Sequence, residues 1–319
     1  MKIVFFSESN YNGMQTYPNV GRTDNNWVFA LNAFHINIYQ HDYGKCGHFD
    51  LGIYIIPKRS PLLSHDTFVK MKGVCHKLAI MQEAAHDNFQ DNSVHSQLEY
   101  IDFVSKVDAI FCHNEIDVKY FKGIFNDKLV FINPTLVITD YLDKTKLTAP
   151  HNRNGVMIGG NMGKWYNGLD SMLIATIFNE QCYVPSMGRK QDEERSIDNI
   201  IHLPYQNWNE WMYDLSKCKY AVHLMRQAAA GSFNLNCSLL KIPCLGWNVI
   251  DTQRLCYPEL SFEVGDMESV WKTANHLSKN KLFYDHVCEY AFRVANDIYS
   301  KENYIKTIKE NYEEILSKP

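Results

Sequence analysis

The second half of the chain contains a turn of small residues between an apolar stretch and a stretch of helical character. Residues 223–246 read HLMRQAAAGSFNLNCSLLKIPCLG, and the turn is expected at 229–232. Because these side chains are short, backbone N–H groups can approach an anion. A helix that begins near Phe233 presents its unpaired N–H groups and its positive dipole end at the same place. The pattern predicts a phosphate site, with close packing of a strand against a helix as the alternative.

A second glycine-rich stretch, GGNMGKWYNGLD, occupies residues 159–170 and follows an apolar segment at 156–158. Its glycines let the backbone approach a ligand, and Lys164 can meet a phosphate as a point charge. The spelling matches neither the GxGxxG of dinucleotide enzymes nor the GxxxxGK[ST] of P-loop ATPases, so both classes are disfavoured. A tight turn with a solvated lysine is the alternative interpretation.

An aromatic loop follows the strand expected at 200–203. Tyr205 and Trp208 stand in this loop, where an aromatic face and free backbone groups suit the flat base of a nucleotide. Hinge or core packing is the alternative role of these rings. The loop, together with Leu203 before it, is the candidate for base recognition.

The first half contains a carboxylate directly after a buried apolar stretch, in LAIMQEAAHDNF. Glu83 follows the strand expected at 77–81, and His86 and Asp87 come shortly after it. A carboxylate shielded from water has a raised pKa and can act as a general base. The alternatives are that Glu83 caps the next helix and that His86 and Asp87 form a surface turn.

His113 stands in the stretch CHNE, after the strand expected at 109–112. The spelling H-x-E is typical of zinc deaminases, but the P-C-x-x-C partner that those sites require is absent, so this class is rejected. The remaining interpretations of His113 are a residue that lines a binding cleft and a buried structural histidine.

Length and composition bound the fold. The chain has 319 residues, of which 45% are hydrophobic and 21% charged, and suits two domains of about 150 residues each. No apolar run reaches the ~18 residues that span a bilayer, and the apolar start is too short for a secretory signal. Nine cysteines without a CxxC pair indicate reduced thiols and a cytoplasmic location. At a net charge of −4, a nucleic-acid partner requires a local basic surface.

Short apolar strands alternate with amphipathic helices, which predicts α/β domains with parallel sheets covered on both faces. The expected strands are 2–6, 36–40, 51–56, 77–81, 109–112, 128–132, 156–158, 181–185, 200–203, 220–225 and 244–247. The expected helices are 24–34, 64–75, one within 93–107, 115–125, 168–178, 208–216, 234–240, 267–280 and a long amphipathic segment at 282–316. A polar linker at 134–154 separates the two halves.

Two doubly wound, Rossmann-like domains followed by a final helix resemble the GT-B glycosyltransferases. The segment LNCSLLKIPCL at 235–245 is similar to the stretch L-E-A-M-A-x-G-x-P-V-V of that family, whose Glu holds the donor ribose. Asn236 occupies the Glu position, which departs from the pattern. The resemblance implies domains at 1–145 and 154–285 that face a cleft, with a helix at 286–319 crossing back to the first domain. The absence of Asp-x-Asp fits donor binding without a metal ion or added cofactor.

Within that fold the chain looks most like the phage DNA β-glucosyltransferases, which also begin MKI. KLAIMQEA matches the stretch that carries their catalytic carboxylate, which makes Glu83 the matching residue. The resemblance implies transfer of a sugar from a UDP-sugar to a 5-hydroxymethylpyrimidine in double-stranded DNA, in the host cytoplasm. A phosphate-binding surface in the first domain would use a group of basic residues, namely Lys58, Arg59, Lys70, Lys72 and Lys77.

Three alternative functions remain: glycosyl transfer to a polysaccharide or small molecule, a sugar-nucleotide epimerase of the same fold, and a non-catalytic nucleotide-sugar-binding protein. Neither the stereochemical outcome nor the oligomeric state follows from the sequence. The long loop at 7–22 is typical of a binding loop. The expected donor-side residues are Gly160, Asn161, Lys164, Leu203, Tyr205, Arg226, Gly231, Ser232, Phe233, Asn234 and Asn236, and the acceptor-side residues are Gly13, Arg22, His86 and His113.

Overall fold

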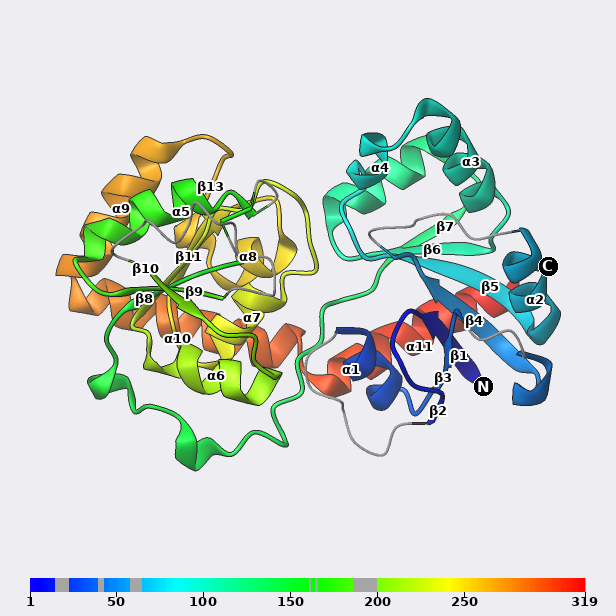
Figure 1. Ribbon diagram of the computed structural model, residues 1–319, viewed down its shortest axis with the longest axis horizontal. Helices are drawn as coiled ribbons and strands as arrows, with labels where there is room; N and C mark the ends of the chain where they lie inside the picture. Colours follow the sequence, from blue (N-terminus) through cyan, green and yellow to red (C-terminus); the bar gives the residue numbers. More distant parts are fainter. Residues whose placement is uncertain are drawn as a thin grey trace. The chain divides into compact units, whose positions relative to one another are not determined.

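The computed structural model describes residues 1–14, 23–39, 43–57, 65–160, 162–163, 166–185 and 200–318. The chain divides into two compact units, each an α/β arrangement of its own (Figure 1). Unit 1 comprises Met1–Leu136, Ala228–Ala230 and Lys301–Pro319, and unit 2 comprises Val137–Gln227 and Gly231–Ser300.

Unit 1 contains a seven-stranded sheet in the order β2-β3-β1-β4-β5-β6-β7. Neighbouring strands are parallel, except that β2 runs antiparallel to β3. In this sheet β1 lies between β3 and β4. The chain first places β3 on one side of β1 and then returns to place β4 on the other side, so the winding direction reverses between β1 and β4. The strands are β1 (Ile3–Ser7), β2 (Gly13–Met14), β3 (Phe34–Asn37), β4 (Phe49–Ile55), β5 (Cys75–Gln82), β6 (Ala109–Cys112) and β7 (Leu129–Ile132).

Helices cover both faces of this sheet. Successive side chains of a strand point to opposite faces, and the strands carry apolar side chains on both, so each face has to be buried. Val4 and Phe6 of β1 join one buried cluster with Phe103. On the other face, the ring of Tyr312 meets that of Phe111 edge-on, with 5.7 Å between the ring centroids. Tyr312 belongs to the last helix, drawn in red in Figure 1, which packs against β4. The helices are α1 (Thr23–Ala30), α2 (His65–Val74), α3 (Val94–Ser105), α4 (Glu115–Ile124) and α11 (Lys301–Ser317).

Unit 2 contains a six-stranded sheet in the order β10-β9-β8-β11-β12-β13, and its neighbouring strands are parallel. The chain winds from β8 toward β9 and β10 and then returns to β11 on the other side of β8. The winding direction therefore reverses between β8 and β11. The strands are β8 (Val156–Ile158), β9 (Cys182–Pro185), β10 (Ile200–Leu203), β11 (Tyr220–His223), β12 (Cys244–Trp247) and β13 (Ser261–Phe262).

In unit 2, α10 packs against α7, α8 and α9, and α5 packs against β11 and α9. A capping box starts α6, because the Asn207 side chain accepts from the Glu210 N–H while the Glu210 carboxylate accepts from the Asn207 N–H. The helices are α5 (Gly168–Ala175), α6 (Trp208–Lys217), α7 (Ser232–Leu239), α8 (Asp251–Cys256), α9 (Met267–Lys279) and α10 (Lys281–Ile298). Single-turn 3-10 helices lie at Tyr43–Cys46, Asn88–Asp91, Lys144–Lys146, Pro150–Asn152, Thr176–Phe178 and Pro258–Leu260.

The predicted fold class, two parallel-sheet α/β regions, is confirmed. Some element positions differ. The strand expected at 36–40 lies at 34–37, because α1 ends early and Asn32 turns the chain in a left-handed conformation with φ 49°. The long segment expected at 282–316 is broken after Ile298 into α10 and α11.

The expected linker at 134–154 packs as part of unit 2 from Val137 onward. Leu142 is buried in the unit 2 core, and the Thr148 N–H donates to Oγ of Ser216 at 3.0 Å. Across the part of the chain that the structure describes, no helix is both long enough and apolar enough to span a membrane.

Candidate functional site

Two glycines and a histidine meet at the carboxyl edge of the unit 2 sheet. Gly159 and Gly160 follow β8, and His223 ends β11, so they flank the point where the winding direction reverses. A Cβ on Gly159 would lie 2.5 Å from Cδ2 of His223. Gly160 has a φ of 74°, and a Cβ there would collide with the ring of Tyr166. The glycine pair is therefore required by the two rings that pack on it. In open α/β sheets this reversal point is the usual ligand site.

Polar side chains connect His223 to the neighbouring elements of unit 2. Nδ1 of His223 lies 3.3 Å from Oδ1 of Asn234, and Nδ2 of Asn234 donates to Oε1 of Gln253 at 2.6 Å. Burial lowers the pKa of His223 to about 4, although the hydrogen bond from its Nδ1 to Asn234 acts in the opposite direction and raises it. The imidazole is therefore neutral at physiological pH. The sequence prediction missed both His223 and Gln253, since neither stands in a recognisable motif.

Helix α7 begins at the predicted small-residue turn. Gly231 precedes its first residue with a φ of 75°, and its carbonyl accepts a hydrogen bond from Oγ1 of Thr252 at 2.9 Å. The N–H groups of Ser232, Phe233 and Asn234 belong to the first turn, where a helix has no internal acceptors for them. The side chain of Asn234 is occupied with His223, so only its backbone N–H remains for an anion.

One turn further along α7 lies the buried side-chain amide of Asn236. Asn236 is 3% exposed, and its Oδ1 has no hydrogen-bond partner within the described ranges. An unpaired buried polar group costs about 1–3 kcal/mol. Such a group in a folded protein calls for an explanation, and a ligand that pairs with it is one. Asn236 thus remains a candidate donor-binding residue.

Arg226 carries the positive charge in the loop between β11 and α7. Its Nη2 lies 3.3 Å from Oδ2 of Asp170, and its side chain is 60% exposed. Nδ2 of Asn167 donates to the same carboxylate oxygen at 2.5 Å and to the carbonyl of Leu224 at 3.1 Å. The guanidinium therefore stays accessible to an anionic ligand while Asp170 orients it.

The remaining donor-side predictions fall in different environments. Leu203 ends β10 and is buried in the unit 2 core, so only its backbone can meet a base. Tyr205 is 82% exposed, which leaves its ring free to stack on one. Asn161 and Lys164 lie outside the described residues.

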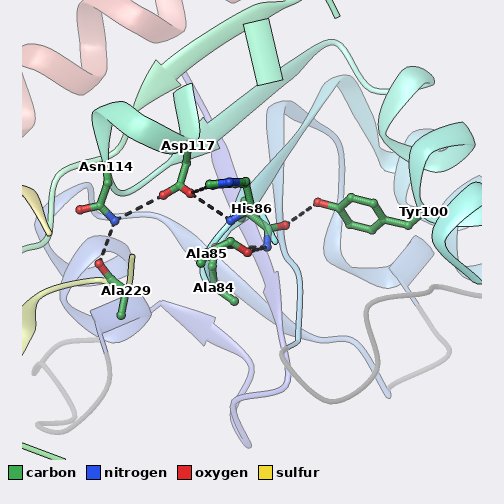
Figure 2. A network of polar contacts seen from close by, with 8 residues as sticks. Ala84, Ala85, His86, Tyr100, Asn114, Asp117 and Ala229 are labelled. Atoms are coloured by element: carbon green, nitrogen blue, oxygen red, sulfur yellow. Dashed lines mark hydrogen bonds and ion pairs between the residues drawn. The ribbon is translucent and has the colours of Figure 1, made fainter. Parts of the chain in front are cut away.

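In unit 1, the loop after β5 positions His86 against a carboxylate of α4 (Figure 2). Both the backbone N–H and Nδ1 of His86 meet Oδ1 of Asp117, at 2.9 and 2.8 Å. Asp117 is 1% exposed, and burial raises the pKa of its carboxyl while the bonds from His86 lower it. The His86 ring stacks on Tyr120 with centroids 4.3 Å apart. The sequence did not reveal Asp117, whose partner is 31 residues away.

Glu83, the predicted base, is the first residue after β5 and is half-buried. The same loop is fixed by Gln82, whose Nε2 donates to the carbonyl of Ala84 at 3.2 Å and whose Oε1 accepts from the Tyr100 hydroxyl at 2.6 Å. Tyr100, Gln82 and the loop carbonyls therefore hold the segment that carries Glu83 and His86. The catalytic role of Glu83 stays a prediction.

Unit 1 includes the segment Ala228–Ala230, which directly precedes α7 along the chain. Nδ2 of Asn114 donates to the carbonyl of Ala229 at 2.9 Å and approaches Oδ2 of Asp117 at 3.4 Å (Figure 2). The Thr135 hydroxyl donates to the carbonyl of Ala230. The first part of the small-residue turn is thus held through its carbonyl groups.

The other acceptor-side predictions differ in exposure. Gly13 lies in β2 with a φ of 96°, and among the described residues no atom lies within 4 Å of the place that a Cβ would take there. His113 is 4% exposed, with its ring centroid 5.4 Å from that of Trp27. Arg22 lies outside the described residues. Among the described residues, no group of three or more His, Cys, Asp and Glu side chains is arranged to hold a metal ion.

The basic surface expected in the first domain needs a correction. Lys77 is 8% exposed, and its Nζ lies 3.7 Å from Oδ1 of Asp108, so it is a buried ion-pair residue of β5. Lys70 and Lys72 are exposed on α2. Lys58 and Arg59 lie outside the described residues.

Comparison with solved structures defines the class of fold as GT-B. An alpha-glucosyltransferase in complex with UDP and a 13-mer DNA containing a HMU base matches with a TM-score of 0.64 and 14% identity, over 98% of this chain and 99% of that one. Sucrose-phosphate synthase from Thermosynechococcus elongatus matches with a TM-score of 0.70 and 8% identity, over 99% and 100%. The chain spans 55% of TarM from S. aureus, with a TM-score of 0.61 and 13% identity. No family model and no curated protein matches the sequence.

Proposed function

We propose that this protein is a glycosyltransferase that moves a sugar from a UDP-sugar to an acceptor hydroxyl. The observation that carries the proposal is the buried amide oxygen of Asn236, one turn from the N-terminus of α7, which has no hydrogen-bond partner among the described residues. The first-turn N–H groups and Arg226 supply the positive potential that a diphosphate requires. The GT-B fold supports this assignment, since similar structures were solved with UDP bound.

The donor is proposed to bind with its diphosphate at the start of α7, because two kinds of positive potential meet there. The backbone N–H groups of Ser232 and Phe233 carry partial charge, and Arg226 carries a full charge. These groups would stabilise the negative charge that develops on the leaving diphosphate, which is the dominant form of catalysis in such transfers. Tyr205 offers an exposed ring for the base.

The acceptor hydroxyl is proposed to be activated at the loop after β5. His86 is the better supported base, because the hydrogen bond from its Nδ1 to Asp117 leaves Nε2 as the basic nitrogen. Glu83, three residues earlier, is the alternative. In an inverting transfer the base removes the proton as the hydroxyl attacks the anomeric carbon. In a retaining transfer the same side chain positions the sugar.

For the acceptor we propose a hydroxymethylated pyrimidine base in double-stranded DNA, which implies a phage protein that works in the host cytoplasm. The support is the match over nearly the full length of both chains to the alpha-glucosyltransferase bound to UDP and DNA. The exposed Lys70 and Lys72 of α2 supply positive charge in unit 1. At a net charge of −4 the protein depends on such local groups for DNA binding.

Product analysis tests this function. The protein is incubated with UDP-glucose and with matched duplexes that contain either hydroxymethylated or plain pyrimidines, and the DNA is examined by mass spectrometry. We expect one added hexose per hydroxymethylated base and none on plain DNA. Transfer to a polysaccharide or a small molecule instead of DNA would reject the acceptor. Release of an epimerised free sugar, or no consumption of any UDP-sugar, would reject the transferase.

A further inference from the structure

A chain of hydrogen bonds leads from backbone carbonyls through side-chain amides to His223. The donor and the acceptor of each bond can be assigned, starting from the backbone. Nε2 of Gln253 donates to the carbonyls of Cys244 and Leu260, at 2.9 and 3.0 Å. A carbonyl only accepts, so the amide nitrogen of Gln253 must face these groups and its Oε1 must be an acceptor. The orientation of Gln253 is thereby fixed.

The orientation of Gln253 determines that of Asn234, which in turn determines which nitrogen of His223 carries the proton. Oε1 of Gln253 accepts from Nδ2 of Asn234 at 2.6 Å, so Oδ1 of Asn234 faces Nδ1 of His223 at 3.3 Å as an acceptor. Nδ1 must therefore carry the proton, and Nε2 of the neutral ring carries a bare lone pair. Burial keeps the ring neutral, since it lowers the pKa of His223 to about 4.

Nε2 of His223 has no hydrogen-bond partner in the part of the chain that the structure describes. The residue is 5% exposed, and its ring fills the space beside Gly159. The ring of Phe233 lies 5.0 Å away between centroids. This acceptor therefore stands between the ends of β8 and β11, at the reversal point of the sheet, where a ligand is expected.

We propose that Nε2 of His223 accepts a hydrogen bond from a hydroxyl group of the bound nucleotide sugar and so contributes to donor specificity. A phosphate oxygen carries no proton at neutral pH and would meet the lone pair unfavourably, so the group that faces His223 is a hydrogen-bond donor. Hydroxyls are the donors that a nucleotide sugar carries in the greatest number. The hydroxyl belongs either to the ribose or to the transferred sugar. The inference rests on the proposed function, because it requires a nucleotide-sugar donor.

Two substitutions separate the ligand role of His223 from its structural role. His223→Asn keeps a donor near the position of Nδ1, and with it the bond to Asn234, but removes the acceptor at the position of Nε2. His223→Gln keeps an acceptor near Nε2 and removes the donor near Nδ1. A ligand role therefore predicts tight donor binding in the Gln variant and weak binding in the Asn variant. A purely structural role predicts the reverse order.

Calorimetric titration of the full-length protein with UDP and with UDP-glucose is the test. We expect His223→Asn to weaken binding about tenfold, which corresponds to the loss of one hydrogen bond, and His223→Gln to bind within about threefold of wild type. His276→Asn on α9, a solvent-facing change in the same unit, is the matched control. Weakened binding of both ligands assigns the ribose hydroxyl, and weakened binding of UDP-glucose alone assigns the transferred sugar.

If His223→Asn binds UDP and UDP-glucose as tightly as wild type does, the inference is wrong. The proposed function is still supported in that case, because the wild-type protein binds the donor. Absence of any binding by the wild type rejects the proposed function itself, and the inference with it. Melting curves of the Asn variant confirm that it is folded, so its result stands whether or not the Gln variant is stable.

Discussion

One carboxylate oxygen of Asp117 accepts two hydrogen bonds from His86, from the backbone N–H at 2.9 Å and from Nδ1 at 2.8 Å. The first bond fixes the loop and the second fixes the ring, so position and tautomer are set by a single side chain. Asp117 is nearly inaccessible, and its second oxygen is approached by Nδ2 of Asn114 at 3.4 Å. The arrangement is that of an orienting carboxylate behind an acid–base histidine.

Asp117→Asn should therefore lower kcat on the order of a hundredfold, the lower range for acid–base catalysis, with KM for UDP-glucose within about threefold. Asp102→Asn, an exposed change on α3, is the control. An unchanged kcat would contradict the role of Asp117.

Asn236→Leu should affect stability and binding in different directions. Since Oδ1 of Asn236 is buried and has no partner in the described part of the chain, an apolar side chain of similar size should leave the free energy of unfolding unchanged or raise it by about 1 kcal/mol. Binding of UDP should weaken about tenfold. Urea unfolding and calorimetry measure the two effects. Loss of stability with unchanged UDP affinity would show that Asn236 serves the fold alone.

Arg226→Ala should weaken UDP binding about tenfold, with a smaller effect at high salt because exposed charges are screened. Arg226 is the exposed partner of its ion pair with Asp170, with a side chain that is 60% exposed, so little stability should be lost. Titrations at low and high salt check this expectation, with Lys272→Ala on α9 as the control. Equal affinities of the Arg226 variant and wild type at low salt would exclude the guanidinium from the donor site.

Because His223 is buried in its neutral form, the free energy of unfolding should be lower in mild acid than at neutral pH. Its folded pKa of about 4 lies below the value near 6.5 for an unfolded chain, so between these values the unfolded state binds a proton that the folded state does not. Stability therefore falls as the pH falls through this window, on the order of 3 kcal/mol in total. Urea unfolding at pH 7 and 4.5 should show a larger loss for wild type than for His223→Asn. Parallel losses would argue against a neutral buried imidazole.

Much of the fold was predictable because local patterns determine it. The strand expected at 109–112 was found as Ala109–Cys112, and the helix expected at 208–216 as Trp208–Lys217, where apolar runs and a cap mark the ends. The two-residue strands β2 and β13 and the six-residue helix α8 were not expected. Elements this short contain no repeat of apolar residues, and their positions depend on pairing with distant strands.

The site was less predictable, because its partners are distant in sequence. The segments after β5, β8, β10 and β11 could be named as ligand loops, since the carboxyl ends of parallel strands meet at one edge. The pairing of His86 with Asp117 spans 31 residues, and that of Asn234 with Gln253 spans 19. Adjacent strands β5 and β6 were the available signal for the first pair. No sequence pattern indicated the second.

Calorimetric titration of the wild-type protein with UDP is the decisive experiment, because the proposed transfer requires a nucleotide site at the start of α7. We expect saturable binding of one UDP per chain, which weakens in Asn236→Leu and in Arg226→Ala and is retained in Lys272→Ala. Binding that none of these substitutions changes, or no binding of UDP or of any UDP-sugar, would contradict the proposed site.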